Sequence, residues 1–424
     1  MELDQSFDSV GFKFAAKLVL VCLAVGIAGR FGFLYMTRAY AGPVPTPSLA
    51  VAQEASPAPI DVSSTTPQRI INTLAIKDVV PQAGKFIAAD LKNMTLALYQ
   101  DGIEIAKYPI LTKGRVGSPY ETPAGFYTIL SKEVDHLNHK EGVHMPWSMQ
   151  FYGNYFIHGW PYYTDGTQVN PNYSGGCIRL GTIDAEKVYA FADKGVGIFV
   201  YDPRPAASSE SIALGAIQPP PISAVAYLVA DVDNGDVYLE QNAEEPRPIA
   251  SITKLMTALV ANETIMFNKD IAVAGDVLRH ATTSAPNRQE TFVVGDLLYP
   301  LLMESNNAVA DRLAQYYGTA GFIGWMNTTA GALNMQSTHF DDASGISSKN
   351  VSTPDDLYRL ATYLANKKSF IWNISRTLTK DLVGDNGDVY HFSNFNLFSG
   401  SPDFIGGKVG QTNSAGNTMV SIFS

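Results

Sequence analysis

Two short stretches of this 424-residue sequence carry side chains that could act as nucleophiles. In NYSGGCIRL, Cys177 directly follows Gly175 and Gly176, whose backbone N–H groups could turn toward the oxygen of a tetrahedral intermediate. A thiol becomes a nucleophile when a base lies close to it, and His158 in YFIHGW precedes it at the end of a β-type run. The same residues also fit a buried, inert thiol, so the spacing alone leaves both interpretations open.

The second stretch, PRPIASITKLMTALV, contains Ser251 and Lys254. At positions i and i+3 of a helix these side chains share one face, and burial would lower the pKa of the lysine until its neutral amine could deprotonate the serine. Ser-x-x-Lys also occurs by chance in many proteins. Two further stretches favour catalysis: LLMESNNAVAD supplies Ser305 and Asn307, and GGKVGQTNSAGNTMV supplies Lys408 and Gly410 on the approach to a strand.

The elements that must position these residues differ between two regions. Residues 84–202 contain short β-rich runs broken by turn residues, and the only expected helix there is DAEKVYAFAD, with Asp184 as its N-cap. Residues 223–424 begin with a hairpin whose turn is Asn234-Gly235, continue with apolar residues at helical spacing, and close with a strand-like run. We therefore expect a mostly-β domain followed by an α/β domain with a sheet and a helical cluster.

The N-terminus contains an apolar stretch at 14–36, which predicts a transmembrane anchor or a signal peptide. We favour the anchor, because the candidate cleavage site AYA at 39–41 lies far from the apolar core. A buried helix of a soluble protein is the third interpretation. Residues 42–83 and 203–222 are expected to be linkers, since both contain runs rich in Pro, Ser and Ala.

Composition excludes some classes of function. The formal net charge of −10 and the scattered Lys and Arg argue against a nucleic-acid partner. Cys22 and Cys177 are the only cysteines, so there is no disulfide framework. Asp135 with His136, His139 and His144 could ligate a metal. A solvated polar loop is the better supported interpretation, and we expect neither a metal nor a cofactor.

Three runs, ETPAGFYTI, MPWSMQFYGNYFIHGW and SGGCIRL, closely resemble the L,D-transpeptidase catalytic domain of bacterial cell-wall enzymes over roughly residues 84–202. The resemblance implies that Cys177 attacks a peptide carbonyl, that His158 takes the thiol proton, and that the carbonyl of Gly159 orients the imidazole. It implies substrate-binding roles for Ser174, Gly176 and Arg179. One position departs from the pattern, since Gly175 stands where members often have histidine.

The Ser-x-x-Lys, Ser-Asn-Asn and Lys-Val-Gly motifs resemble, in order and spacing, the penicillin-interactive D-alanyl-D-alanine carboxypeptidases over about residues 223–424. The resemblance casts Ser251 as the acylated nucleophile and oxyanion donor and Lys254 as the general base. Ser305 would relay a proton, Asn307 would contact the substrate amide, and Lys408, with Gly410, would bind its terminal carboxylate.

Two features depart from that family. Val409 replaces the usual threonine of the third motif, and the chain ends at Ser424 inside the following strand, where we expect apolar surface and strand edges to be uncovered.

Together the two resemblances imply a bifunctional peptidoglycan-remodelling enzyme of the bacterial cell envelope, with its catalytic domains outside the cytoplasmic membrane. Peptidoglycan stem peptides would be its substrates and β-lactam antibiotics its inhibitors. Three alternatives stay open. The carboxypeptidase-like domain could be an inactive binding module; that domain could instead be a serine β-lactamase; and the cysteine domain could use water as its acceptor.

Overall fold

The computed structural model describes residues 75–203 except 140, 171 and 173, and residues 222–424 except 279–288 and 386. Contacts divide the chain into residues 1–66 and residues 67–424, and every described residue belongs to the second unit. The expected anchor at 14–36 and most of both linkers lie outside the described residues. Within the described ranges, no helix is long and apolar enough to cross a membrane.

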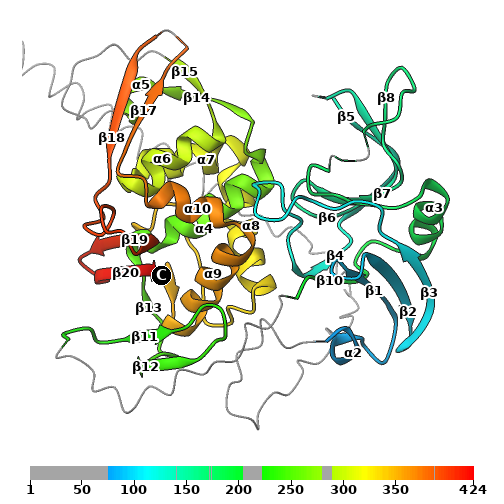
Figure 1. Cartoon of the computed structure of the whole chain (residues 1–424), viewed down its shortest axis with the longest axis horizontal. Helices are drawn as coiled ribbons and strands as arrows, with labels where there is room; N and C mark the ends of the chain where they lie inside the picture. The colour runs from blue at the N-terminus through cyan, green and yellow to red at the C-terminus, as the bar shows by residue number, and fades with distance from the viewer. Residues whose placement is uncertain are drawn as a thin grey trace, which may run out of the picture. The chain divides into compact units, whose positions relative to one another are not determined.

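Residues 75–203, called here the β-rich part, form two sheets. The first has the order β3-β2-β1-β10-β4, and the second has the order β5-β6-β7-β9 with β8 paired to β6 (Figure 1). The elements are α2 (Ile76–Val79), β1 (Lys85–Asp90), β2 (Thr95–Gln100), β3 (Ile103–Pro109), β4 (Gly125–Thr128), β5 (Ser131–Asn138), β6 (Val143–Tyr152), β7 (Tyr155–His158), β8 (Tyr162–Tyr163), β9 (Ile178–Arg179), α3 (Thr182–Phe191) and β10 (Gly197–Tyr201).

Strand β1 shows why the first sheet holds together. It pairs with β2 on one side and with β10 on the other, and its side chains are buried on both faces. Ile87 and Ala89 join one apolar cluster, while Phe86 and Ala88 join another. A strand covered on both faces is a central strand of its sheet. Strands outnumber helices among the described residues of this part, so the expected mostly-β character is observed.

The expected helix of this part is α3, but its N-cap differs from the prediction. The helix begins at Thr182 after Gly181, whereas Asp184 lies in its first turn and pairs with Lys187 at 3.2 Å. The prediction of Asp184 as the N-cap was therefore wrong. A carboxylate in the first turn still stabilises the helix through the helix dipole, so the sequence signal was misplaced by one turn.

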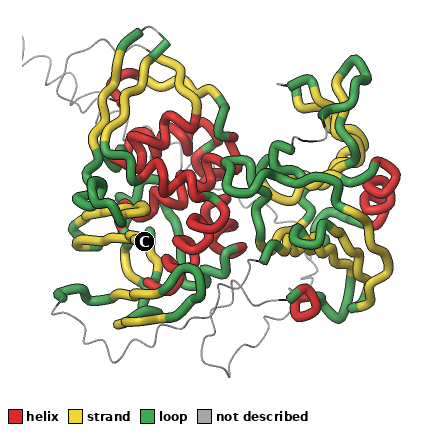
Figure 2. The backbone as a smooth tube through the Cα atoms, viewed as in Figure 1, coloured by secondary structure: helices red, strands yellow, loops and turns green. Residues whose placement is uncertain are grey.

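Residues 222–424, called here the helix-rich part, contain most of the helices that the structure describes (Figure 2). Its elements are β11 (Tyr227–Ala230), β12 (Val237–Gln241), β13 (Arg247–Pro248), η2 (Ala250–Ile252), α4 (Thr253–Val260), the π-helical turn η3 (Ala261–Met266), β14 (Asp270–Ala274), α5 (Gly275–Leu278), β15 (Gln289–Val293), α6 (Val294–Met303), α7 (Asn307–Tyr317), α8 (Thr319–Ala332), β16 (Val351–Ser352), α9 (Pro354–Lys367), α10 (Ser369–Ser375), β17 (Thr379–Val383), β18 (Val389–Ser393), β19 (Phe404–Thr412) and β20 (Gly416–Phe423).

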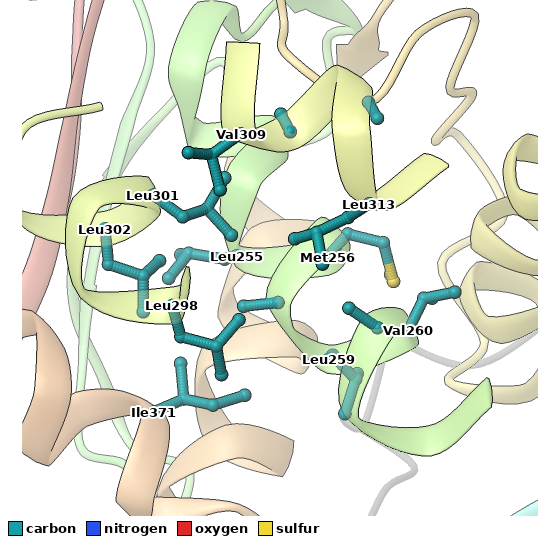
Figure 3. Close-up of a cluster of buried hydrophobic side chains, with 14 of the residues drawn as sticks. Leu255, Met256, Leu259, Val260, Leu298, Leu301, Leu302, Val309, Leu313 and Ile371 are labelled. Carbon is teal, nitrogen blue, oxygen red and sulfur yellow. The ribbon is translucent and has the colours of Figure 1, made fainter. Parts of the chain in front are cut away.

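Helix α4 lies at the centre of this part. Its residues are all buried, and Leu255 and Leu259 pack against leucines of α6, Val309 and Leu313 of α7, and Ile371 of α10 (Figure 3). A helix that is buried all round is held by its neighbours on every side. The residues at its N-terminus are therefore fixed by a well-packed core.

The strands of the helix-rich part differ from the expected single sheet. In the described ranges they form separate two-stranded sheets, among them the hairpin β11-β12 at Asn234-Gly235, which confirms the predicted turn. Strands β19 and β20 pair only with each other there, and Met419 and Phe423 of β20 are exposed. Strand β19 nevertheless lies directly beside Ser251.

Candidate active sites

Strand pairing brings His158 and Cys177 to one face of the second sheet. Strands β7 and β9 run parallel, with Ile157 opposite Ile178 and His158 opposite Arg179. The paired isoleucines point into the apolar core. Because side chains alternate along a strand, His158, Arg179 and the preceding Cys177 project from the other face.

The imidazole of His158 is buried and held by its own neighbour. Its Nδ1 lies 2.6 Å from the carbonyl oxygen of Gly159, and only 1% of the residue is exposed. Burial lowers the pKa of His158 to about 3, helped by the charge of Arg179 and by His136 and opposed by the bond to Gly159. A neutral imidazole that donates from Nδ1 leaves Nε2 as a proton acceptor.

The thiol of Cys177 is also held in its neutral form. Burial raises the pKa of Cys177 to about 11, although a hydrogen bond from the Phe156 backbone and the charge of Arg179 act in the opposite direction. Its Sγ lies 3.8 Å from the carbonyl oxygen of Asn154. Because the resting pair is neutral, nucleophilic attack requires that the proton leave the thiol as the new bond forms.

A tight turn positions Cys177. Gly176 has φ +106°, and a Cβ atom there would lie 2.2 Å from the Tyr155 ring. Ser174 Oγ donates to the carbonyl of Cys177 at 2.7 Å and accepts from the Gly176 N–H at 3.2 Å. In this conformation Ser174 closes the turn, and the Gly176 N–H already has a partner.

Arg179 lies beside the same turn. It is buried, with 5% exposed, and its guanidinium lies 6.0 Å from the centre of the Trp160 ring. Its charge acts on the pKa of both Cys177 and His158. Arg179 therefore contributes a positive potential to the site.

Two of the clustered histidines lie on opposite faces of one strand pair. His136 is opposite Met145 and His144 is opposite Leu137 in the β5-β6 pair, so the two rings lie on opposite faces of that pair. His144 Nδ1 lies 2.7 Å from a carboxylate oxygen of Asp135. In the described part of the chain, no group of three potential ligands converges. The ring of His136 instead packs against Phe156, and His136 helps to lower the pKa of His158. The sequence did not predict this role.

The serine site is built at the start of α4. Ser251 lies in the short helix η2, and Lys254 Nζ donates to its Oγ at 3.0 Å and to Asn307 Oδ1 at 2.7 Å. A third bond from Lys254 Nζ goes to the carbonyl oxygen of Ser344. The structure thus brings together Ser251, Lys254 and Asn307. The i, i+3 spacing predicted this for the first two, and the family resemblance implied it for Asn307.

Ser305 lies two residues before Asn307 in the sequence, but it does not share the hydrogen bonds around Lys254 in the described residues. It lies in the turn between α6 and α7 with φ +59°. In the described residues, no hydrogen bond joins its hydroxyl to Ser251 or Lys254. Its predicted part in proton relay therefore stays a prediction.

Two buried lysines have lowered pKa values at this site. Burial lowers the pKa of Lys254 to about 7, and the carboxylates of Asp342 and Asp311 oppose the shift. Burial also lowers the pKa of Lys408 to about 7, with a further contribution from the charge of Lys254. Both amines therefore exchange protons near neutral pH, where general bases are most effective.

Strand β19 passes very close to the serine. A Cβ atom on Gly410 would lie 2.7 Å from the Ser251 backbone nitrogen. Lys408 is two residues earlier on the same face, with its Nζ donating to the carbonyl of Val409 at 2.7 Å. A glycine is thus required beside the predicted oxyanion donor.

The loop at 341–350 also belongs to this site, although no sequence motif predicted a role for it. The carboxylate of Asp342 accepts from the backbone N–H groups of Ser344, Gly345 and Ser347 at 2.8, 2.5 and 2.6 Å. The buried side chain of Asn350 donates to Asp342 Oδ1 at 3.1 Å. These bonds fix the Ser344 carbonyl that accepts from Lys254. The DDASG run, typical of a side-chain-capped turn, was the available signal.

Comparison with known proteins agrees with this division of the chain. Residues 214–423 match the family model of D-alanyl-D-alanine carboxypeptidase, and residues 84–200 match that of the L,D-transpeptidase catalytic domain. Both resemblances inferred from the sequence are thereby confirmed.

Among the similar proteins are D-alanyl-D-alanine peptidases of other bacteria. A D-alanyl-D-alanine endopeptidase of Haemophilus influenzae is 36% identical over 165 residues, which are 36% of this chain and 55% of that protein. One from Escherichia coli is 30% identical over 231 residues, which are 51% of this chain and 72% of that protein. A solved D-alanyl-D-alanine carboxypeptidase from Mycobacterium tuberculosis is 28% identical, with a TM-score of 0.45, covering 50% of this chain and 81% of that one.

Proposed function

The chain belongs to the D-alanyl-D-alanine carboxypeptidase family over residues 214–423 and also contains an L,D-transpeptidase catalytic domain match at 84–200, and on this premise we propose that it remodels peptidoglycan with two separate nucleophiles. The observation that carries the proposal is the contact of Lys254 Nζ with Ser251 Oγ at 3.0 Å, where burial lowers the lysine pKa to about 7. A buried amine that is neutral in part of the molecules at physiological pH is a suitable base for a serine hydroxyl.

In the helix-rich part, Lys254 takes the hydroxyl proton while Ser251 Oγ attacks the carbonyl before the terminal D-Ala. The Ser251 N–H, beside Gly410, stabilises the oxyanion, and Lys408 attracts the terminal carboxylate. D-Ala leaves and water releases the shortened stem. Asn307 holds Lys254 in place and contacts the substrate amide.

In the β-rich part, His158 Nε2 accepts the thiol proton as Cys177 Sγ attacks the carbonyl before the terminal D-Ala of a stem tetrapeptide. The C–N bond breaks, His158 gives the proton to the leaving amine, and D-Ala departs. The acyl group then passes from the thioester to an amine of a second stem. The neutral state of both groups supports a concerted step, in which the thiol proton is transferred to His158 while the sulfur–carbon bond forms. Arg179 stabilises the negative charge that develops.

The two reactions fit in series. Removing the last D-Ala from a pentapeptide leaves a tetrapeptide, which is the acyl donor of the second reaction. We place the protein in the bacterial cell envelope, where such stems occur, and the apolar stretch at 14–36 supports export as an anchored or a cleaved protein. β-Lactams would acylate Ser251 as substrate mimics.

The test follows muropeptides by mass spectrometry. Ser251→Ala should crosslink tetrapeptide stems at the normal rate but fail with pentapeptides, and Cys177→Ala should trim pentapeptides without crosslinking. Equal crosslinking of both donors by Ser251→Ala would contradict the serial scheme. Trimming that persists in Ser251→Ala would contradict the role of the serine itself.

A second candidate function is favoured by Val409, which supplies no hydroxyl to a substrate carboxylate. In that case the helix-rich part binds stems without cleaving them, and only Cys177 reacts. A fluorescent penicillin distinguishes the two, because an active Ser251 becomes covalently labelled. Protein labelled in Cys177→Ala but not in Ser251→Ala supports the two-nucleophile enzyme; the absence of label supports the binding module.

A further inference from the structure

The helix-rich part contacts the loops that hold Cys177. Both parts belong to the compact unit of residues 67–424. The contacts come from Asn262, Glu263 and Thr264 in the π-helical turn η3, which continues α4, and from Lys368 between α9 and α10. π-Helical turns are rare and are frequent at functional sites.

One route runs through the loop at 119–122. Lys368 Nζ donates to the carbonyl oxygens of Glu121 at 2.8 Å and Pro119 at 3.3 Å, and Asn262 Nδ2 donates to that of Pro119 at 2.8 Å. From the same loop, Thr122 Oγ1 donates to the carbonyl of Gly176 at 2.8 Å. Two donors of the helix-rich part thus fix a loop that holds the residue before the nucleophile.

A second route ends on the sulfur. Asn154 Nδ2 donates to the carbonyl oxygen of Thr264 at 2.5 Å. The neighbouring Gly153 lies so close that a Cβ atom there would be 2.7 Å from the carbonyl oxygen of Glu263. The carbonyl of Asn154 is the group 3.8 Å from Cys177 Sγ. The peptide that contacts the thiol is therefore anchored on η3.

The charges at this contact are fully buried. The side chains of Lys368 and Glu263 are 0% and 1% exposed, with Nζ and Oε1 3.4 Å apart. Buried ion pairs are often less stabilising than apolar side chains of similar size, although breaking one is costly. What Lys368 supplies that an apolar side chain cannot is its directed N–H bonds to two carbonyl groups.

We propose that Lys368 and Asn262 are positioning residues for Cys177, so that side chains of the helix-rich part hold in place the backbone that presents the thiol. The proposal rests on the proposed reaction of Cys177 for its activity readout, but its geometric content does not. Without these donors the 119–122 loop and the Gly176 turn lose their support, and the thiol becomes more accessible and less well aligned.

The experiment uses the full chain with Lys368→Met, which keeps the length of the side chain and removes its donors. Asn262→Leu removes the second donor to Pro119 without leaving a buried charge unpaired. Thr329→Val is the matched control, because it deletes another hydrogen bond between the two parts that does not involve the 119–122 loop. That bond joins Thr329 Oγ1 and the Tyr152 hydroxyl, which are 2.5 Å apart.

Three readouts are taken for each variant. The kcat of crosslinking from tetrapeptide donors should fall about tenfold or more with little change in KM, because misplacement of the nucleophile affects the chemical step. Alkylation of Cys177 by iodoacetamide should become about threefold faster, because the thiol is less buried. Labelling of Ser251 by fluorescent penicillin should stay within about twofold of the unmodified protein, which reports that the peptidase part is folded.

Slower crosslinking with faster alkylation in Lys368→Met and Asn262→Leu, but not in Thr329→Val, supports the proposal. Unchanged alkylation and crosslinking in Asn262→Leu overturn it, even if Lys368→Met fails to fold and loses its Ser251 label. Equal effects in all three variants also overturn it, because they indicate general loosening. If the unmodified protein does not crosslink, the proposed function fails, while the alkylation rates still decide whether the residues position the thiol.

Discussion

At the scale of single residues, burial determines the chemistry of both nucleophiles. Burial favours the neutral form of both Lys254 and His158, but to different extents: the pKa of Lys254 falls to about 7 and that of His158 to about 3. The lysine therefore titrates within the physiological range, whereas the histidine stays neutral throughout it. Only the serine reaction should depend strongly on pH near neutrality.

The rate of penicillin acylation of Ser251 should rise with pH to a maximum near 7 and then fall. The pKa of Lys254 is lowered, so the neutral amine that acts as base is scarce below this value and abundant above it. Lys408, also with a pKa of about 7, loses the charge that attracts a carboxylate over the same range. A bell-shaped profile is expected in stopped-flow labelling, and Lys408→Met should remove its falling limb. A rising limb near the ordinary lysine pKa of about 10.4 would show that Lys254 is not desolvated.

Val409 offers a gain-of-function test. Val409→Thr keeps the side-chain volume and adds a hydroxyl that can donate to a substrate carboxylate. A hydrogen bond to a charged group contributes about 1.5–3 kcal/mol, so kcat/KM for D-Ala release should rise at least about tenfold. Val409→Ile, which adds no hydroxyl, is the control, and D-Ala release is followed by a coupled assay. No gain in Val409→Thr would mean that the carboxylate lies elsewhere.

At the scale of elements, turns and one helix position the groups. The Gly176 turn presents Cys177, and the 341–350 loop presents the Ser344 carbonyl to Lys254. Helix α4 begins at the Ser251 site, and its continuation η3 reaches the Asn154 peptide beside Cys177. One continuous helical segment therefore contributes to both sites.

Gly176→Ala should abolish the cysteine reaction and spare the serine one. The backbone there has φ +106°, and the added methyl would lie 2.2 Å from the Tyr155 ring, so the turn must move. Displacement of a nucleophile by about 1 Å costs about 100-fold in rate. Gly166→Ala is the control, since its φ is +86° but nothing lies within 4 Å of the new methyl. The hypothesis fails if both variants crosslink equally well while Ser251 is labelled in each.

At the scale of the whole molecule, the described residues of the two parts share buried contacts. Tyr152 packs edge-on against Trp325 with ring centres 5.1 Å apart, and Lys367 pairs with Asp202 at 2.5 Å. The expected linker at 203–222 predicted two domains joined by a tether. The contacts show that the two parts also share an interface. If the parts separated, the buried charges of this interface would lose their partners.

The protein should therefore unfold in one transition. Tryptophan fluorescence, loss of the Ser251 label and exposure of Cys177 to a thiol reagent should change together on heating, because the parts stabilise each other. Lys367→Met should lower this shared midpoint without separating the three signals. Two midpoints several degrees apart in the unmodified protein would show that the parts unfold independently.

The sequence alone determined the local features. Ser251 and Lys254 share a face because i and i+3 do so on any helix, and Asn234-Gly235 forms a turn because these residues tolerate positive φ. The order of the motifs identified both families, because the residue types that carry out a reaction can be recognised from the sequence alone. The N-cap of α3 was misjudged because neighbouring turn residues compete for that position.

Only the tertiary structure decided the protonation states and the support of each nucleophile. The pKa of Lys254 depends on how completely distant segments exclude water from it, and its third partner, Ser344, lies far along the chain. The contacts of Lys368 and Asn262 with the 119–122 loop join residues that no local pattern relates. Desolvation and long-range hydrogen bonds are properties of the packed chain, because they arise only when segments separated in sequence close around the same group.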